Sequence, residues 1–303
     1  MPLIPIALRD VVRQLQKMSL ENVGIKAEHQ FATLPARPKV SVVIPLYQSL
    51  DFLQSQIAHF ANDPFMRECE VIYVLDSPEQ ETQLHTRLRD YSRLYRFPMS
   101  LYVMSKNGGY ATAVNFGASR ARAEHLLLLN SDVLPMQYGW LSQLWNTYKI
   151  REPYIGALAP KLLYEDGSIQ HAGMYFKKDT TESFYENMHY FKGYPAHHQE
   201  ANQSREVPAV SAACVMMKTS LFNEARQLTT EYIAGDFEDS DLCLKLFSQG
   251  YRHFYDADVT LYHFERQSMN ALNAQAAERY TLNVTAHHER WSHRIKEVMQ
   301  NYE

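Results

Sequence analysis

Hydrophobic and polar positions in the first half of the chain alternate between short apolar runs and longer amphipathic segments. The short apolar runs that predict buried strands are 39–47, 70–76, 99–104 and 125–129. The segments between them with helical spacing are 50–61, 79–95 and 110–122. This strand–helix order with short connections predicts an α/β fold, a Rossmann-like and mostly parallel sheet flanked by helices.

The second half of the chain is less regular. Helical spacing recurs at 138–150 and 239–249, and strands are predicted at 156–164, 173–177 and 207–217, with two short strands in 251–263. The polar and aromatic segment 178–206 has no clear period and predicts a long loop. Loops of this length inside a compact domain are often functional.

Two terminal helices, 6–23 and 271–297, flank this body. We expect three parts: an N-terminal helix with an extended linker (1–38), a central domain (39–268) in two halves (39–135 and 136–268), and a C-terminal helix (269–303). The apolar stripe of the first helix favours packing on the body or on a second subunit, because its polar face is not strongly basic. Peripheral membrane contact and homo-oligomer formation through these helices both stay open.

Composition narrows the class of protein. The 303 residues can bury a large core, and a net charge of −4 gives no basic field that would indicate nucleic acid as a partner. Three widely spaced cysteines without metal-ligand spacing fit a reducing cytoplasm. The start of the chain does not resemble a signal peptide, and no apolar run approaches about 20 residues. We expect a cytoplasmic protein, with contact at the inner face of the membrane left open.

Four carboxylates stand within six residues, directly before and inside the start of the helix at 239–249. They are Asp236, Glu238, Asp239 and Asp241. Packing acids against a core raises the pKa of at least one of them, which favours a chemical task such as accepting a proton or holding a cation. Asp241 lies inside the helix, where its charge suits the helix dipole. Asp236 is assigned no task beyond ending a strand.

Other polar candidates follow the ends of predicted strands. Tyr47, Asp76, Asn107 and Asp132 each lie just past an apolar run or close to its end. Ligands of parallel α/β sheets bind outside the carboxyl ends of the strands. We therefore expect these side chains to gather at one edge of the sheet.

Six short motifs, taken in order, resemble the family 2 glycosyltransferases of the GT-A fold, and in particular their bacterial rhamnosyl- and galactosyltransferase-like branch. The motifs lie at 42–47, 107–117, 129–133, 167–173, 238–242 and 261–268. The resemblance implies an inverting hexosyl- or deoxyhexosyltransferase of polysaccharide biosynthesis. Such an enzyme moves a sugar from a nucleoside-diphosphate donor (UDP or dTDP) to a saccharide or lipid-linked acceptor.

The resemblance also implies site residues. Asp239 would be the general base, with Glu238 orienting the base or the acceptor. Asp132 and His263 would hold Mg²⁺ or Mn²⁺ on the diphosphate, although Asn130-Ser131-Asp132 has an amide where the family often has a second carboxylate. The implied contacts to the donor nucleotide are Pro45, Tyr47, Asp76, Asn107, Gly109, Ser131 and Arg266.

Each assignment has a structural alternative. Asp76, Asp132 and the Asn107–Gly109 segment could be ordinary turns, His263 a core residue, and Arg266 part of a surface ion pair. Two other functions also stay open. One is a non-catalytic module of the same fold that binds a sugar nucleotide or a partner. The other, a nucleotidyltransferase, is less favoured because 44–49 lacks a glycine-rich basic stretch.

Overall fold

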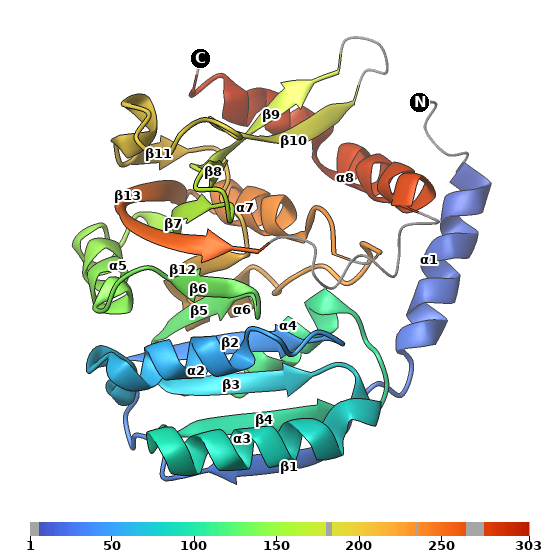
Figure 1. The fold of residues 1–303 in the computed structure, drawn as a ribbon. Coiled ribbons are helices and arrows are strands. Elements are labelled where there is room, and N and C mark those ends of the chain that lie inside the picture. The colour runs from blue at the N-terminus through green and yellow to red at the C-terminus, as the bar shows by residue number, and fades with distance from the viewer. Residues whose placement is uncertain (1–5, 180–183, 234, 265–275, 303) are drawn as a thin grey trace.

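The computed structural model describes residues 6–179, 184–233, 235–264 and 276–302 (Figure 1). The strands are β1 (Ile25–Phe31), β2 (Val40–Leu46), β3 (Glu70–Leu75), β4 (Met99–Met104), β5 (His125–Leu129), β6 (Val133–Pro135), β7 (Ile155–Leu163), β8 (Ile169–His171), β9 (Met174–Lys178), β10 (Tyr185–His189), β11 (Arg205–Val207), β12 (Cys214–Lys218) and β13 (Arg252–His263). The α-helices are α1 (Ile6–Leu20), α2 (Leu53–Asn62), α3 (Glu81–Tyr95), α4 (Tyr110–Ser119), α5 (Trp140–Ile150), α6 (Thr219–Glu224), α7 (Glu238–Ser248) and α8 (Ala276–Met299).

One large sheet runs through the molecule in the order β1-β4-β3-β2-β5-β12-β7-β13-β11. Its predicted first half is confirmed: β2 is parallel to β3 and β5, and β3 is parallel to β4. Helices α2 and α3 cover one face of these strands and α4 covers the other (Figure 1). The residues of β3, β4 and β5 are all buried, which explains their continuous apolar runs. The predicted α/β fold class is therefore confirmed.

A glycine allows α4 to pack closely on this sheet. A Cβ atom added at Gly117 would lie 2.5 Å from a Val43 methyl carbon and 2.9 Å from one of Val74. Gly117 ends the second half of the 107–117 motif. Its place in that motif is explained by helix–strand packing, without contact to a ligand.

The segment between the first helix and the body contains a strand, where an extended linker was expected. Strand β1 pairs antiparallel with β4 at the edge of the sheet. Its exposure alternates along the strand until the buried Phe31. This two-residue alternation is visible in the sequence and is the signal that the linker interpretation overlooked.

The loop predicted at 178–206 is wrong in part. Strand β10 pairs with β9 to form a two-stranded sheet, and β11 pairs with β13. The strand predicted over 207–217 is confined to β12, and the two strands predicted in 251–263 are one strand with an irregularity between Asp256 and Thr260. All five residues of β10 are half-buried, so its sequence lacks the apolar contrast that marks a strand.

Both predicted terminal helices form and pack on the body. Helix α8 contacts α7, β9 and β10. Helix α1 stands along one side of the molecule (Figure 1) and leaves Val11, Leu15 and Met18 more than half exposed. None of the helices in the described ranges combines the length and apolar composition needed to cross a membrane.

Candidate active site

The acidic segment forms the first turn of α7. Glu238 is buried, and Asp239 is partly exposed. Burial raises the pKa of Glu238 well above its ordinary value. Burial also raises the pKa of Asp239, to about 6, against the opposing effect of hydrogen bonds from the backbone N–H groups of Ser240 and Ala212. Asp239 is therefore an acid that solvent can reach and that titrates close to neutral pH.

Tyr110, the first residue of α4, is affected by the acids of this turn and by Asp132 after β5. Its hydroxyl donates a hydrogen bond to the carbonyl of Ala212 (3.3 Å). Its pKa is raised, first by burial and then by the negative charges of Glu238, Asp239 and Asp132. Three acids from two distant parts of the chain thus act on one phenol. The sequence motif included Tyr110 without a role, and its place directly after two glycines at a helix start was the available signal.

The two residues predicted to hold a metal lie together. The Nε2 atom of His263 is 3.5 Å from Oδ1 of Asp132, and their side chains are 8% and 14% exposed. Pairing of β13 with β6 sets His263 opposite Val133 and so creates this contact. Metal-binding histidines usually donate their other ring N–H to a neighbour, but Nδ1 of His263 is buried without a hydrogen-bond partner among the described residues.

These groups fit a divalent cation on a diphosphate. Mg²⁺ commonly uses only one or two protein carboxylates and takes its other oxygens from phosphate and water, and Mn²⁺ accepts the same oxygen ligands. Asp132 supplies the carboxylate and His263 an imidazole nitrogen. The side-chain oxygen of Asn130 is also buried without a hydrogen-bond partner among the described residues, so a further neutral oxygen is available nearby.

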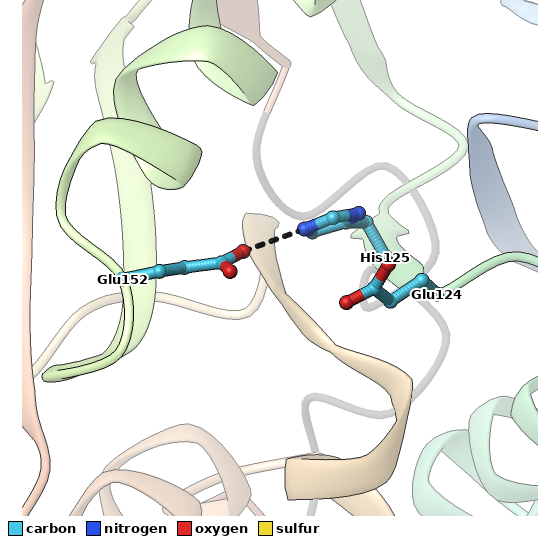
Figure 2. A group of neighbouring side chains, drawn as sticks. All are labelled: Glu124, His125 and Glu152. Atoms are coloured by element: carbon cyan, nitrogen blue, oxygen red, sulfur yellow. Dashed lines mark hydrogen bonds and ion pairs between the residues drawn. The ribbon is translucent and has the colours of Figure 1, made fainter.

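A second group with metal-ligand geometry lies at the opposite end of β5. Glu124, His125 and Glu152 have ligand atoms within 4.8 Å of one another (Figure 2). His125 Nε2 is 2.9 Å from Glu152, and Lys218 Nζ is 3.2 Å from Glu124 and 2.9 Å from Glu152. The Lys218 ammonium pairs with both carboxylates. This group is an ion-pair network remote from the acids of α7.

Asp76 organises the turn that precedes α4. Its two carboxylate oxygens accept hydrogen bonds from the backbone N–H groups of Gly108 (2.7 Å) and Gly109 (2.8 Å). Burial nonetheless raises the pKa of Asp76 to about 6. Asn107 accepts a further bond from the Gly109 N–H (2.9 Å), and Gly109 has a φ of +79°, which disfavours any side chain there. The contact between Asp76 and the donor nucleotide stays a prediction.

Three further residues that were predicted to contact the donor nucleotide lie at the expected edge of the sheet. Pro45 and Tyr47 are partly buried at and just after the end of β2, and Ser131 is partly buried after β5. Tyr47 accepts a hydrogen bond from the Gln48 side chain (3.0 Å). Arg266 lies outside the described residues. Their contacts to a nucleotide stay predictions.

Asp241 differs from its predicted role at the helix dipole. Its carboxylate is fully buried, and five side chains bind it: Thr229 (2.6 Å), Tyr232 (3.1 Å), Lys245 (2.8 Å), Arg290 (3.1 Å) and Trp291 (2.7 Å). Burial would raise its pKa, but the charge of Lys245 and these hydrogen bonds leave it lowered. Asp241 therefore joins α7 to α8. Asp236 does not end a strand, because it lies in a bend before α7.

His287 of α8 contacts the acidic turn. Its Nε2 is 3.1 Å from the hydroxyl of Ser240, and Asn187 of β10 donates to the same hydroxyl (2.8 Å). Burial lowers the pKa of His287 to about 3, so the ring is neutral near pH 7. Sequence reasoning gave Ser240 and Asn187 no role, because the three residues come from three distant elements.

Comparison with known proteins gives a family and a fold. The sequence profile described as "Glycosyl transferase family 2" matches residues 41–225. The O-antigen biosynthesis protein RfbC of Myxococcus xanthus is 26% identical over 248 residues, which are 77% of this chain and 18% of that protein. The chain thus spans less than a fifth of the length of this relative.

Two solved structures share the architecture. GalNAc-T7 with UDP, GalNAc and Mn²⁺ superposes with a TM-score of 0.58 at 15% identity, over 77% of this chain and 45% of that one. The mannosyltransferase PcManGT from Pyrobaculum calidifontis, in complex with GDP-Man and Mn²⁺, gives 0.53 at 16% identity, over 86% and 67%. At these identities the likeness establishes the GT-A fold alone.

Proposed function

Because this chain belongs to glycosyl transferase family 2, we propose that it transfers a hexosyl or deoxyhexosyl group from UDP- or dTDP-sugar, with inversion, to a saccharide or lipid-linked acceptor. The observation that carries the proposal is that the charges of Glu238, Asp239 and Asp132 all raise the pKa of the same Tyr110 hydroxyl. A proton acceptor and a candidate ligand for the diphosphate cation thus lie at one edge of the sheet.

Asp239 acts as the base in this proposal. An acceptor hydroxyl oxygen bonds to the anomeric carbon as the bond from that carbon to the diphosphate oxygen breaks, and the electron pair leaves with the nucleoside diphosphate. The hydroxyl proton passes to Asp239. Burial raises the pKa of Glu238 well above its ordinary value, which favours the protonated form that can donate a hydrogen bond to orient the acceptor.

Asp132 and His263 would hold the divalent cation. When bound, such an ion neutralises the charge that develops on the leaving diphosphate. Ser131, Pro45, Tyr47, Asp76 and the Asn107–Gly109 turn would contact the nucleotide, and Arg266 would reach the diphosphate.

The rate of transfer should depend on pH through Asp239. A base acts only when deprotonated, and the pKa of Asp239 is raised to about 6. We expect kcat to be level above pH 7 and to fall about tenfold per pH unit below pH 6. A pH–rate profile in buffers of constant ionic strength measures this. A profile level down to pH 4 would contradict the assigned pKa.

Removal of His263 should weaken the binding of the metal. We expect His263→Ala to raise the Mn²⁺ concentration for half-maximal activity by about tenfold or more. Glu152→Gln, in the ion-pair network of Figure 2, is the matched control and should leave it unchanged. A metal titration of EDTA-treated protein measures both. If Glu152→Gln raised this Mn²⁺ concentration and His263→Ala did not, the metal would instead be assigned to the Glu124–His125–Glu152 group.

A panel of UDP-, dTDP- and GDP-sugars, each with and without Mn²⁺, tests the proposed activity. Thermal shift reports binding, and release of nucleoside diphosphate reports turnover. We expect a UDP- or dTDP-sugar to bind and to be turned over. Binding without release would support the non-catalytic module, and release of pyrophosphate would support a nucleotidyltransferase.

The biological setting is also a proposal. RfbC is described as a protein of O-antigen biosynthesis, and we propose a role in polysaccharide biosynthesis for this chain. Its three cysteines are buried and free, which suits a reducing cytoplasm. Oligomer formation and membrane contact through the terminal helices stay predictions.

A further inference from the structure

A pocket of about 420 Å³ lies beside Glu238, bounded by α1, the start of α4 and residues of the 230–235 segment. Its volume is within the range of about 300–1,000 Å³ typical of sites for small organic ligands. Of the residues predicted to bind nucleotide or metal, Asn107 and Gly109 line it, whereas Tyr47, Asp132 and His263 do not. Of the two proposed catalytic acids, Glu238 lines the pocket and Asp239 does not, and the metal pair lies outside its lining.

Helix α1 forms one wall of this pocket, and hydrogen bonds join it to the two loops that border the pocket. Gln16 donates hydrogen bonds to the carbonyls of Thr230 (2.7 Å) and Tyr232 (3.0 Å). At the end of the helix, Lys106 donates to the carbonyl of Glu21 (2.7 Å). Helix α1 thus bridges the two loops that border the pocket. It lies outside the 41–225 segment that matches the family, so this wall is a feature of this chain beyond the matched segment.

The lining of the pocket suits an uncharged ligand. Neither lysine nor arginine occurs among the described residues that line it, so no cationic side chain there favours a negatively charged ligand. Val12, Leu15 and Leu20 of α1 supply an apolar surface. The side-chain oxygen of Gln16 is buried and has no hydrogen-bond partner among the described residues, so it can accept a bond from a ligand hydroxyl.

Glu238 supports the same conclusion from the opposite wall. Glu238 lines the pocket, and burial raises its pKa well above the ordinary value, which favours the protonated carboxyl group that can donate a hydrogen bond to a ligand hydroxyl. A sugar ring has hydroxyls at its rim and C–H bonds on its faces. It could therefore meet the polar groups and the apolar side chains of this pocket at once.

We propose that α1 forms a wall of the acceptor site and that this site takes a neutral saccharide unit of the acceptor. The inference rests on the proposed transferase function. It adds a determinant of specificity, because the side chains of α1 decide which acceptor sugar can lie beside Glu238.

Filling the pocket from α1 tests this inference. Ser19 lines the pocket, and serine and phenylalanine have similar helix propensities, so Ser19→Phe adds bulk with little change to the helix. Gln14→Phe is the matched control, because Gln14 is exposed, does not line the pocket and lies five residues earlier on the same helix. The acceptors are p-nitrophenyl hexosides and 6-deoxyhexosides, with the p-nitrophenyl glucuronide as the charged comparison.

We expect Ser19→Phe to raise the KM for neutral acceptors about tenfold or more, with the donor KM and the hydrolysis of donor by water unchanged. Gln14→Phe should behave as the wild type. If Ser19→Phe lowers the melting temperature, Ser19→Leu, which adds less volume, replaces it.

Three results would overturn the inference. One is an unchanged acceptor KM in a folded Ser19 variant. The second is a raised donor KM, which would assign the pocket to the donor sugar. The third is a wild-type preference for the glucuronide. Failure of the proposed function is a separate result, because the wild type would then release no nucleoside diphosphate from any donor.

Discussion

Replacement of Asp239 by asparagine is expected to lower kcat for sugar transfer by about 10²–10⁴-fold, the usual contribution of a positioned base. Asparagine has nearly the same shape, and its side-chain oxygen can still accept the hydrogen bond from the Ser240 N–H (2.7 Å). It cannot accept a proton. Donor affinity, measured by titration of the nucleotide sugar, should therefore stay close to that of the wild type while product formation is lost.

Asp236→Asn is the matched control for this variant. The same chemical change occurs three residues earlier, at an acid whose charge contributes to the raised pKa of Asp239. We expect transfer to persist and the acid limb of the pH profile to move to lower pH, because removing a negative neighbour favours the ionised base. Near wild-type transfer by Asp239→Asn would show that another residue takes the proton.

Replacement of Asp241 by asparagine is expected to lower the free energy of unfolding by about 3 kcal/mol, the lower end of the range for breaking a buried ion pair. The change leaves the cations of Lys245 and Arg290 without their buried partner. The lower end of that range applies because both cations reach solvent: the side chain of Lys245 is 16% exposed and that of Arg290 is 32% exposed. Urea unfolding at pH 7, followed by tryptophan fluorescence, measures the loss.

Glu231→Gln is the control for Asp241→Asn. Glu231 is the exposed partner of Arg290 (2.9 Å), and an exposed pair contributes at most about 1 kcal/mol. Equal losses of unfolding free energy in the two variants would show that burial of Asp241 does not account for the stability that its ion pairs contribute.

The stability difference for Asp241 should also depend on pH. The folded state lowers the pKa of this carboxyl group. Its contribution is therefore fully present above the unfolded pKa of about 3.9 and is lost as the pH falls through the folded value. The gap between wild type and Asp241→Asn should narrow in acid. A gap that widens below pH 4 would contradict the lowered pKa.

Much of the fold was predictable because its signals are local. The runs 70–76, 99–104 and 125–129 are strands buried on both faces, and this burial requires the continuous apolar sequence from which they were predicted. The strands that the sequence did not predict are β1 at the edge, the half-buried β10 and the three-residue strands β6, β8 and β11. No continuous apolar run marks β1 or β10, and the partner of β1, β4, lies far away in the chain.

The sequence by itself determined the parallel half of the sheet and the order of the motifs that place the chain near a glycosyltransferase family. Only the tertiary structure gave the acids of the 236–241 segment different environments. Asp239 stays partly open to solvent beside Tyr110, whereas Asp241 is buried by partners up to 50 residues away. Only the folded chain brings Asp132 to His263 and lays α1 over the pocket beside Glu238. The physical reason is that a carboxylate has the same intrinsic chemistry at each position, and its burial and partners, which long-range packing decides, set its pKa and its task.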